Sequence, residues 1–96
     1  MSERYAIRPG VTLQTVAGEY LLIAANEAQP FCPYVQQLNS TAAYLWSLLA
    51  DGMDVDRMTE EAARHFDIPK QDIESDIRVL LNRFRDKCCI TLYQKS

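Results

Sequence analysis

The pattern of apolar and polar positions divides the chain into a strand-rich first part and a helical second part. Residues 11–16 begin by alternating apolar and polar positions, which predicts a strand followed by a turn where Gly18 takes a positive φ. Residues 20–25 are apolar on both faces and predict a central strand covered on both sides. The strand predicted at residues 34–38 is short and carries two glutamines, which is typical of an edge strand.

Three helices joined by short turns are predicted after residue 38. Ser40 is the expected N-cap of the first helix, which ends at Asp51-Gly52, and Asp54 is the expected N-cap of the second. The third helix is expected from about residue 70 to residue 86 or 87. Apolar residues recur at helical spacing in each helix: Ala42, Leu45, Trp46 and Leu49; Val55, Met58, Ala62 and Phe66; Ile73, Ile77, Leu80, Leu81 and Phe84.

The third helix has an apolar surface wider than one core contact requires. At about 100° per residue, Val79 lies off the centre of the core stripe, on the side that carries Asp76 and Arg83. One interpretation is a helix covered on two sides by its own domain. The other is a second, partly exposed apolar strip that is available to a partner.

These elements predict one α+β domain, residues 1–96 with a core at about 11–90, of winged helix-turn-helix-like shape. We expect a small three-stranded antiparallel sheet followed by three helices. Residues 1–10 carry no predicted element beyond the punctuation at Pro9 and Gly10. Residues 88–94 fit either a last short strand or a tail packed over the core.

The charge and composition of the 96-residue chain argue against several classes of partner. A net charge of −3 disfavours nucleic acid and anionic membranes as partners, and no apolar run is long enough to cross a bilayer. A winged-helix DNA-binding regulator remains an alternative, although Asp72, Glu74 and Asp76 would oppose phosphates at the start of the third helix. Because the N-terminus lacks the order of a signal peptide, we expect a cytoplasmic protein.

The residues that usually carry chemistry are few. Cys32, Cys88 and Cys89 make a poor disulfide framework and are interpreted as reduced thiols packed as small apolar groups. A zinc site that also recruits His65 is the alternative, but it lacks Cys-x-x-Cys spacing. No nucleophile has a base at a recognisable spacing, and no Gly-rich loop is present. We therefore expect neither an enzyme nor a bound cofactor.

A binding module is the class that remains. An unpaired edge at residues 34–38, beside the apolar strip around Val79, predicts a groove for an extended peptide that adds to the sheet as a further strand. The same open edge would also allow the chain to pair with a second copy, so a homodimer is an alternative use of it.

Four motifs in order resemble the PqqD family, named for pyrroloquinoline-quinone synthesis, and together they span about residues 11–90. The stretch from Leu38 to Ala43 resembles the family's "LN-x-T-A-x" entry to the first helix. The later matches are Leu45-Trp46 to Asp51-Gly52, Val55 with Met58, and Asp76-Ile77 followed by Leu80-Leu81.

This resemblance implies a recognition element of ribosomally synthesised and post-translationally modified peptides (RiPPs). Such a domain binds the leader segment of a precursor peptide and presents it to a modifying enzyme, often a radical S-adenosylmethionine enzyme. Carried over by position, the resemblance implies peptide-binding residues on a strand and on the third helix: Tyr34, Val35, Gln36, Gln37 and Leu38; Asp76, Val79, Leu80 and Arg83.

The chain also differs from the members that act in quinone synthesis. Its loop at residues 26–33 is longer, Ala50 replaces a cysteine that those members often carry, and Cys88-Cys89-Ile90 replaces a closing "G-L". A role in a lasso or thioether-bridged peptide system therefore stays open beside a role as a pyrroloquinoline quinone biosynthesis protein D proper.

Overall fold

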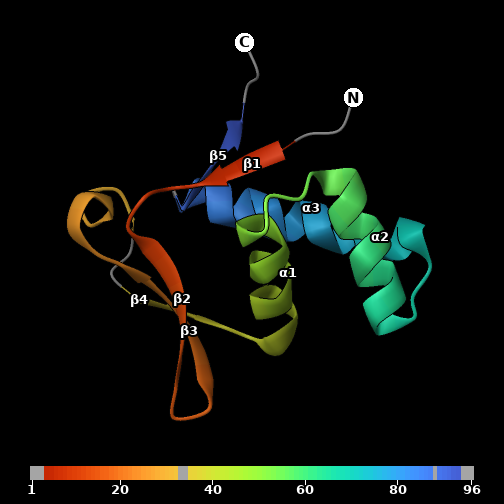
Figure 1. Ribbon diagram of the computed structural model, residues 1–96, viewed down its shortest axis with the longest axis horizontal. Helices are drawn as coiled ribbons and strands as arrows, with labels where there is room; N and C mark the ends of the chain where they lie inside the picture. The colour runs from red at the N-terminus through yellow and green to blue at the C-terminus, as the bar shows by residue number, and fades with distance from the viewer. Residues whose placement is uncertain (1–3, 33–34, 88, 94–96) are drawn as a thin grey trace.

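A computed structural model of the chain describes residues 4–32, 35–87 and 89–93. Its elements in chain order are β1 (Arg4–Ile7), β2 (Val11–Val16), β3 (Glu19–Ala24), the 3-10 turn η1 (Asn26–Ala28), β4 (Val35–Leu38), α1 (Ser40–Ala50), α2 (Val55–Phe66), α3 (Lys70–Asp86) and β5 (Ile90–Tyr93). The predicted α+β fold, with a three-stranded antiparallel sheet followed by three helices, is confirmed (Figure 1).

The three-stranded sheet has the order β2-β3-β4, so the strand that was predicted to be central is central. In β3, Leu22 and Ala24 are buried against the core, whereas Leu21 and Ile23 on the opposite face are half-buried. The prediction that both faces of this strand are covered is therefore wrong for the outer face. Leu21 and Ile23 belong neither to the core cluster nor to the partly buried residues packed against it.

A second, two-stranded sheet joins the two ends of the described chain. Strand β1 pairs antiparallel with β5, with Tyr5 opposite Leu92 and Ile7 opposite Ile90. From the sequence alone, no strand is predicted at residues 4–7, and residues 88–94 fit either a strand or a tail. A four-residue strand has too short a hydrophobic pattern to stand out until its partner, which lies more than 80 residues away, is known.

The three helices begin and end close to their predicted positions. The predicted N-cap of α1 is wrong by one residue, because the side chain of Asn39, not of Ser40, accepts a hydrogen bond from the backbone N–H of Ala42 at 2.7 Å. Asp54 caps α2 as predicted, accepting from the N–H of Arg57 at 2.8 Å. Gly18 and Gly52 take the predicted positive φ, at 80° and 85°.

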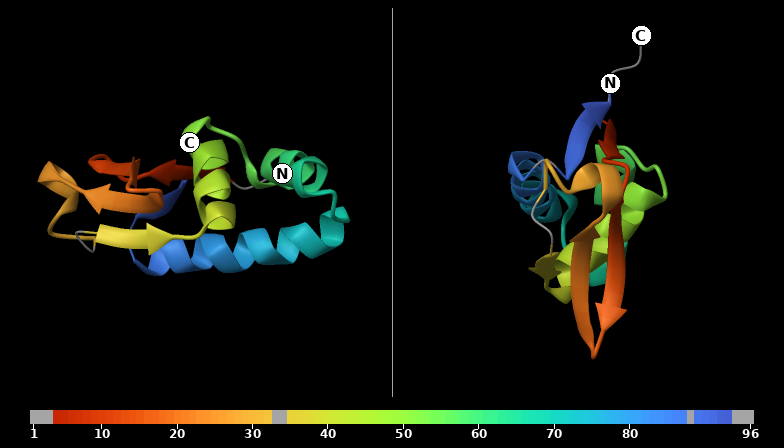
Figure 2. Two further views of the ribbon diagram at one scale, coloured as in Figure 1. Left: turned by 90° about the horizontal axis from the view of Figure 1, so that it is seen from below. Right: turned by 90° about the vertical axis from the view of Figure 1, so that its left-hand side faces the viewer.

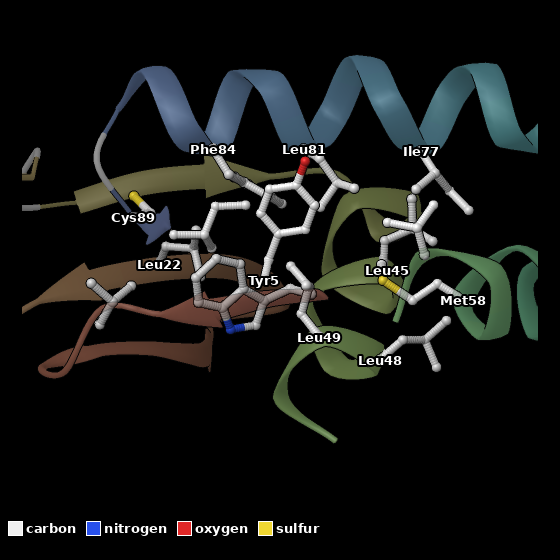
Figure 3. Close-up of a cluster of buried hydrophobic side chains, with 14 of the residues drawn as sticks. Tyr5, Leu22, Leu45, Leu48, Leu49, Met58, Ile77, Leu81, Phe84 and Cys89 are labelled. Carbon is white, nitrogen blue, oxygen red and sulfur yellow. The ribbon is translucent and has the colours of Figure 1, made fainter. Parts of the chain in front are cut away.

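The core lies where the helices meet the inner face of the three-stranded sheet. Figure 3 shows Tyr5 of β1, Leu22 of β3 and Phe84 of α3 pointing into one cluster. Trp46 packs edge-to-face on Phe84 at a centroid distance of 5.1 Å. This packing fixes α1 and α3 on the same side of the sheet. In the described part of the chain, no helix is both long and apolar enough to cross a membrane.

Candidate functional site

Strand β4 is one of the two edge strands of the three-stranded sheet, the other being β2. Its register places Val35 opposite Ile23 and Leu38 opposite Tyr20 of β3, and within the described ranges no strand pairs with its other side. The predicted strand residues Val35, Gln36, Gln37 and Leu38 therefore line a row of backbone groups at an open edge. Tyr34, the fifth residue predicted there, lies outside the described residues.

The side chains of β4 alternate between two environments. Gln36 and Leu38 are half-buried, whereas Val35 is 46% exposed and Gln37 is exposed, with its amide donating to Glu19 Oε1 at 3.0 Å. A peptide that added beside β4 would place alternate side chains on the same two faces, because successive residues of a strand point in opposite directions.

A hollow of about 260 Å³ opens between the first turns of α1 and the middle of α3. It brings together all four helix residues that the sequence analysis selected, with Val79 61% exposed and Leu80 half-buried. We call this feature the α1–α3 hollow. Its lining residues are Asn39, Thr41, Ala42, Leu45, Asp76, Val79, Leu80 and Arg83.

Helix α1 forms the side of the hollow opposite α3. No residue of α1 was predicted from the sequence to belong to the site. Thr41 stood in a family motif, and Ala42 and Leu45 stood in the core stripe of α1. These two apolar residues are indeed buried, yet they also close the inner end of the hollow. The residues of β4 do not line the hollow, but β4 runs into it, because Asn39 directly follows Leu38.

Asp76 and Arg83 place opposite charges on the α3 side of the hollow. They are seven residues apart, which is about two helical turns, or roughly 10 Å along the axis. Among the described residues, neither side chain forms an ion pair or a side-chain hydrogen bond with another, so both charges are free to meet a ligand.

Strand β4 is held to the C-terminal end of α3 by a side-chain contact. Gln36 Nε2 donates a hydrogen bond to Cys89 Sγ at 2.9 Å, across 53 positions in the sequence. Viewed from below, β4 lies alongside the C-terminal part of α3 and leads into α1 (Figure 2). The chain therefore connects the open edge of β4 to the α1–α3 hollow through Asn39.

Another group of polar side chains lies outside the α1–α3 hollow. Exposed His65 stacks on Tyr44 at 4.1 Å between ring centroids. Burial, followed by the nearby Glu61 charge, raises the pKa of Tyr44, which leaves it a neutral hydrogen-bond donor. In the described ranges, no group of three or more histidines, cysteines and carboxylates is placed to hold a metal ion.

The described thiols are buried, as packed groups would be, but the Cys89 thiol also accepts the hydrogen bond from Gln36. Cys32 and Cys89 are buried, and Cys88 lies outside the described residues. The acidic side chains at the start of α3 are exposed, where they would oppose the phosphates of DNA. One of them, Glu74, pairs with Arg78 at 3.7 Å. These acidic groups leave the first turns of α3 poorly suited to phosphate contacts.

Comparison with solved structures finds the same fold in two described complexes. "TbiB1 in Complex with the TbiA(beta) Leader Peptide" matches with a TM-score of 0.75 at 18% identity, covering 93% of this chain and 98% of that chain. "Lasso peptide synthetase B1 complexed with the leader peptide" matches with a TM-score of 0.74 at 19% identity, covering 92% and 98%. Comparison with curated proteins finds no match.

The family comparison covers the part of the chain that builds the site. The model of the family described as "Coenzyme PQQ synthesis protein D (PqqD)" matches residues 33–90, more than half of the chain. This range contains β4, the three helices and every residue of the α1–α3 hollow. The chain is therefore a member of the PqqD family.

Proposed function

We propose that this protein is a non-catalytic RiPP recognition element that binds the leader segment of a precursor peptide and presents it to a modifying enzyme. The leader adds as a strand beside β4, along Tyr34, Val35, Gln36, Gln37 and Leu38. It continues against α3, where Val79 and Leu80 form the apolar wall and Asp76 and Arg83 act as polar anchors. The whole of residues 1–96 acts as one peptide-binding domain.

One observation carries this proposal: an open strand edge leads directly into a hollow that has an exposed valine. Strand addition needs free backbone donors and acceptors together with pockets for alternate side chains. The edge of β4 offers the first, and the α1–α3 hollow offers the second. Exposed Val79 has an apolar surface that gains from being covered by a peptide side chain.

The comparisons support the same assignment. Two proteins with this fold are described in complex with leader peptides, and the family model is named for coenzyme PQQ synthesis. Within this proposal, the enzyme that receives the peptide belongs to a lasso, thioether-bridged or quinone pathway, and in many such systems it is a radical S-adenosylmethionine enzyme. We further propose that binding takes place in the cytoplasm, where ribosomal precursors are made.

The direct test is a titration of isotopically labelled protein with the synthetic leader segment of a candidate precursor peptide. We expect the backbone amide signals of β4 and α3 to shift as the peptide binds, because its backbone would pair with β4 and its side chains would enter the hollow. Shifts confined to α2 and the outer face of the three-stranded sheet would contradict the proposed location.

A second copy of the chain is the alternative occupant of the β4 edge. We propose that the free edge is used by the peptide, with self-association as a weaker competitor for the same backbone groups. Sedimentation velocity with and without the leader separates these uses. A dimer that the peptide leaves intact would assign the edge to self-association.

A further inference from the structure

Cys89 is a buried residue that joins three separate segments of the chain. Its side chain is completely buried, and its backbone N–H donates to the carbonyl of Phe84 in α3 at 3.0 Å. Its own carbonyl accepts from the N–H of Arg8, between β1 and β2, at 2.9 Å. The backbone position of Cys89 is therefore fixed from two sides, at the point where α3 ends (Figure 3).

The thiol of Cys89 makes the third connection. Sγ accepts the hydrogen bond from Gln36 Nε2 at 2.9 Å, and the thiol lies 3.7 Å from the carbonyl of Lys87, to which it can donate. Gln36 is the middle of the β4 edge, and it faces inward with Leu38. Because Cys89 is held by α3, this bond links the position of the edge strand to the position of the helix.

We propose that Gln36 and Cys89 are a pair of positioning residues that holds β4 against the C-terminal end of α3 and so sets the spacing of the peptide-binding groove. This inference rests on the proposed function. It adds a role for a buried cysteine at the end of α3, and for the inward side chain of a strand whose backbone meets the peptide.

The physical argument concerns an edge strand of only four residues. Among the described strands it pairs only with β3, and two contacts hold it toward the helices: Leu38 packs against the core cluster near α1, and the Gln36–Cys89 bond ties the strand to the end of α3. A peptide must contact β4 and α3 at once. If the distance between them varies in the free protein, fixing that distance costs conformational entropy when the peptide binds. Loss of the bond is therefore expected to lower peptide affinity more than it lowers the stability of the core.

The first test replaces the donor. Gln36→Leu keeps the approximate size of the side chain and removes the hydrogen bond. In the free variant we expect amide hydrogen exchange in β4 to be faster than in the wild type while exchange in β2 is unchanged, and binding of a fluorescein-labelled candidate leader peptide to be about threefold to tenfold weaker. Gln14→Leu is the matched control, since Gln14 is an exposed glutamine of β2 that bonds only to Thr12 among the described residues, at 3.4 Å.

The second test replaces the acceptor. Cys89→Ser keeps an acceptor for Gln36, whereas Cys89→Ala removes it, so Ser should restore slow exchange in β4 and most of the affinity. In the double variant Gln36→Leu/Cys89→Ala, the second substitution should weaken binding less than it does alone, because the two residues share one interaction. The melting temperature of each variant is measured alongside, to separate loss of fold from loss of positioning.

The outcomes separate this inference from the function on which it rests. If Gln36→Leu leaves both β4 exchange and peptide affinity at wild-type values, the positioning role is wrong. If β4 exchange accelerates while affinity is unchanged, the pair holds the strand without setting the groove, and the proposal is also wrong. If the wild-type protein binds no leader, the proposed function fails, while the exchange measurement still decides whether the pair restrains β4.

Discussion

Val79 is the side chain whose substitution best separates binding from folding. It is 61% exposed in the free protein and lines the α1–α3 hollow. We expect Val79→Asp to weaken leader binding by tenfold or more, because the bound peptide would cover a carboxylate in place of an apolar side chain, and removing water from that charge costs roughly 1–3 kcal/mol. Fluorescence anisotropy with the labelled leader gives the affinity, and circular dichroism checks the fold.

Val16→Asp is the matched control for this prediction. Val16 is 48% exposed and lies at the end of β2, the strand farthest from the β4 edge. We expect it to leave the affinity unchanged. If Val79→Asp instead unfolds the domain, Val79 contributes to the core and the groove is wrongly placed.

Asn39 and Ser40 differ in role although they are neighbours with similar polar side chains. The Asn39 carboxamide oxygen accepts from the N–H of Ala42, so Asn39→Ala should lower the free energy of unfolding by about 0.5–2 kcal/mol. Ser40 is exposed in the first turn, and Ser40→Ala should change it by less than about 0.5 kcal/mol. Urea denaturation measures the free energy of unfolding of both variants. A larger loss for Ser40→Ala than for Asn39→Ala would identify Ser40 as the N-cap.

At the scale of elements, β4 is distinctive because its backbone, more than its side chains, is expected to bind. Alternate backbone groups of an edge strand point away from the sheet, so a paired peptide uses every second amide. Single N-methyl groups placed along the leader should therefore weaken binding with a period of two. Competition against the labelled leader would measure this period, and a uniform or absent effect would argue against strand addition.

Helix α3 serves the core and the candidate site with different faces. Ile73, Ile77, Leu81 and Phe84 are buried, whereas Val79 is exposed and Leu80 is half-buried at the border between the two. This division explains why the apolar arc of α3 is wider than its core contact. Packing of its buried face against the core holds the helix in place, and with it the exposed residues on the other face.

At the scale of the whole molecule, the β1–β5 sheet closes the fold. β1 contacts α1, and β5 contacts α3, so the pair connects the chain ends to both helices of the hollow. Tyr5 of β1 is 6% exposed and belongs to the core cluster. We expect Tyr5→Ala to lower the free energy of unfolding by about 3 kcal/mol or more, as other buried aromatic truncations do.

Arg4→Ala is the control on the same strand, because Arg4 is exposed and should cost less than about 0.5 kcal/mol. Thermal unfolding of each variant, followed by calorimetry, gives its loss of unfolding free energy relative to the wild type. An unchanged melting temperature for Tyr5→Ala would show that the β1–β5 pair lies outside the cooperative unit.

Residues close together in sequence determined most of the local structure. Helical spacing of apolar residues predicted all three helices, Asp54 and Gly52 marked the boundaries between two of them, and the two glutamines of β4 indicated an edge strand. These signals are local: periodicity and capping depend on neighbours within a turn or two. The same signals identified the exposed strip of α3 around Val79.

Only the tertiary structure decided the features that depend on distant residues. The pairing of β1 with β5, the α1 wall of the hollow and the contact between Gln36 and Cys89 each join positions far apart in the chain. Choosing between Asn39 and Ser40 as the cap also required geometry, since either side chain can accept the same kind of bond. Long-range partners leave no periodic trace in the sequence, because each is set by how the whole chain packs.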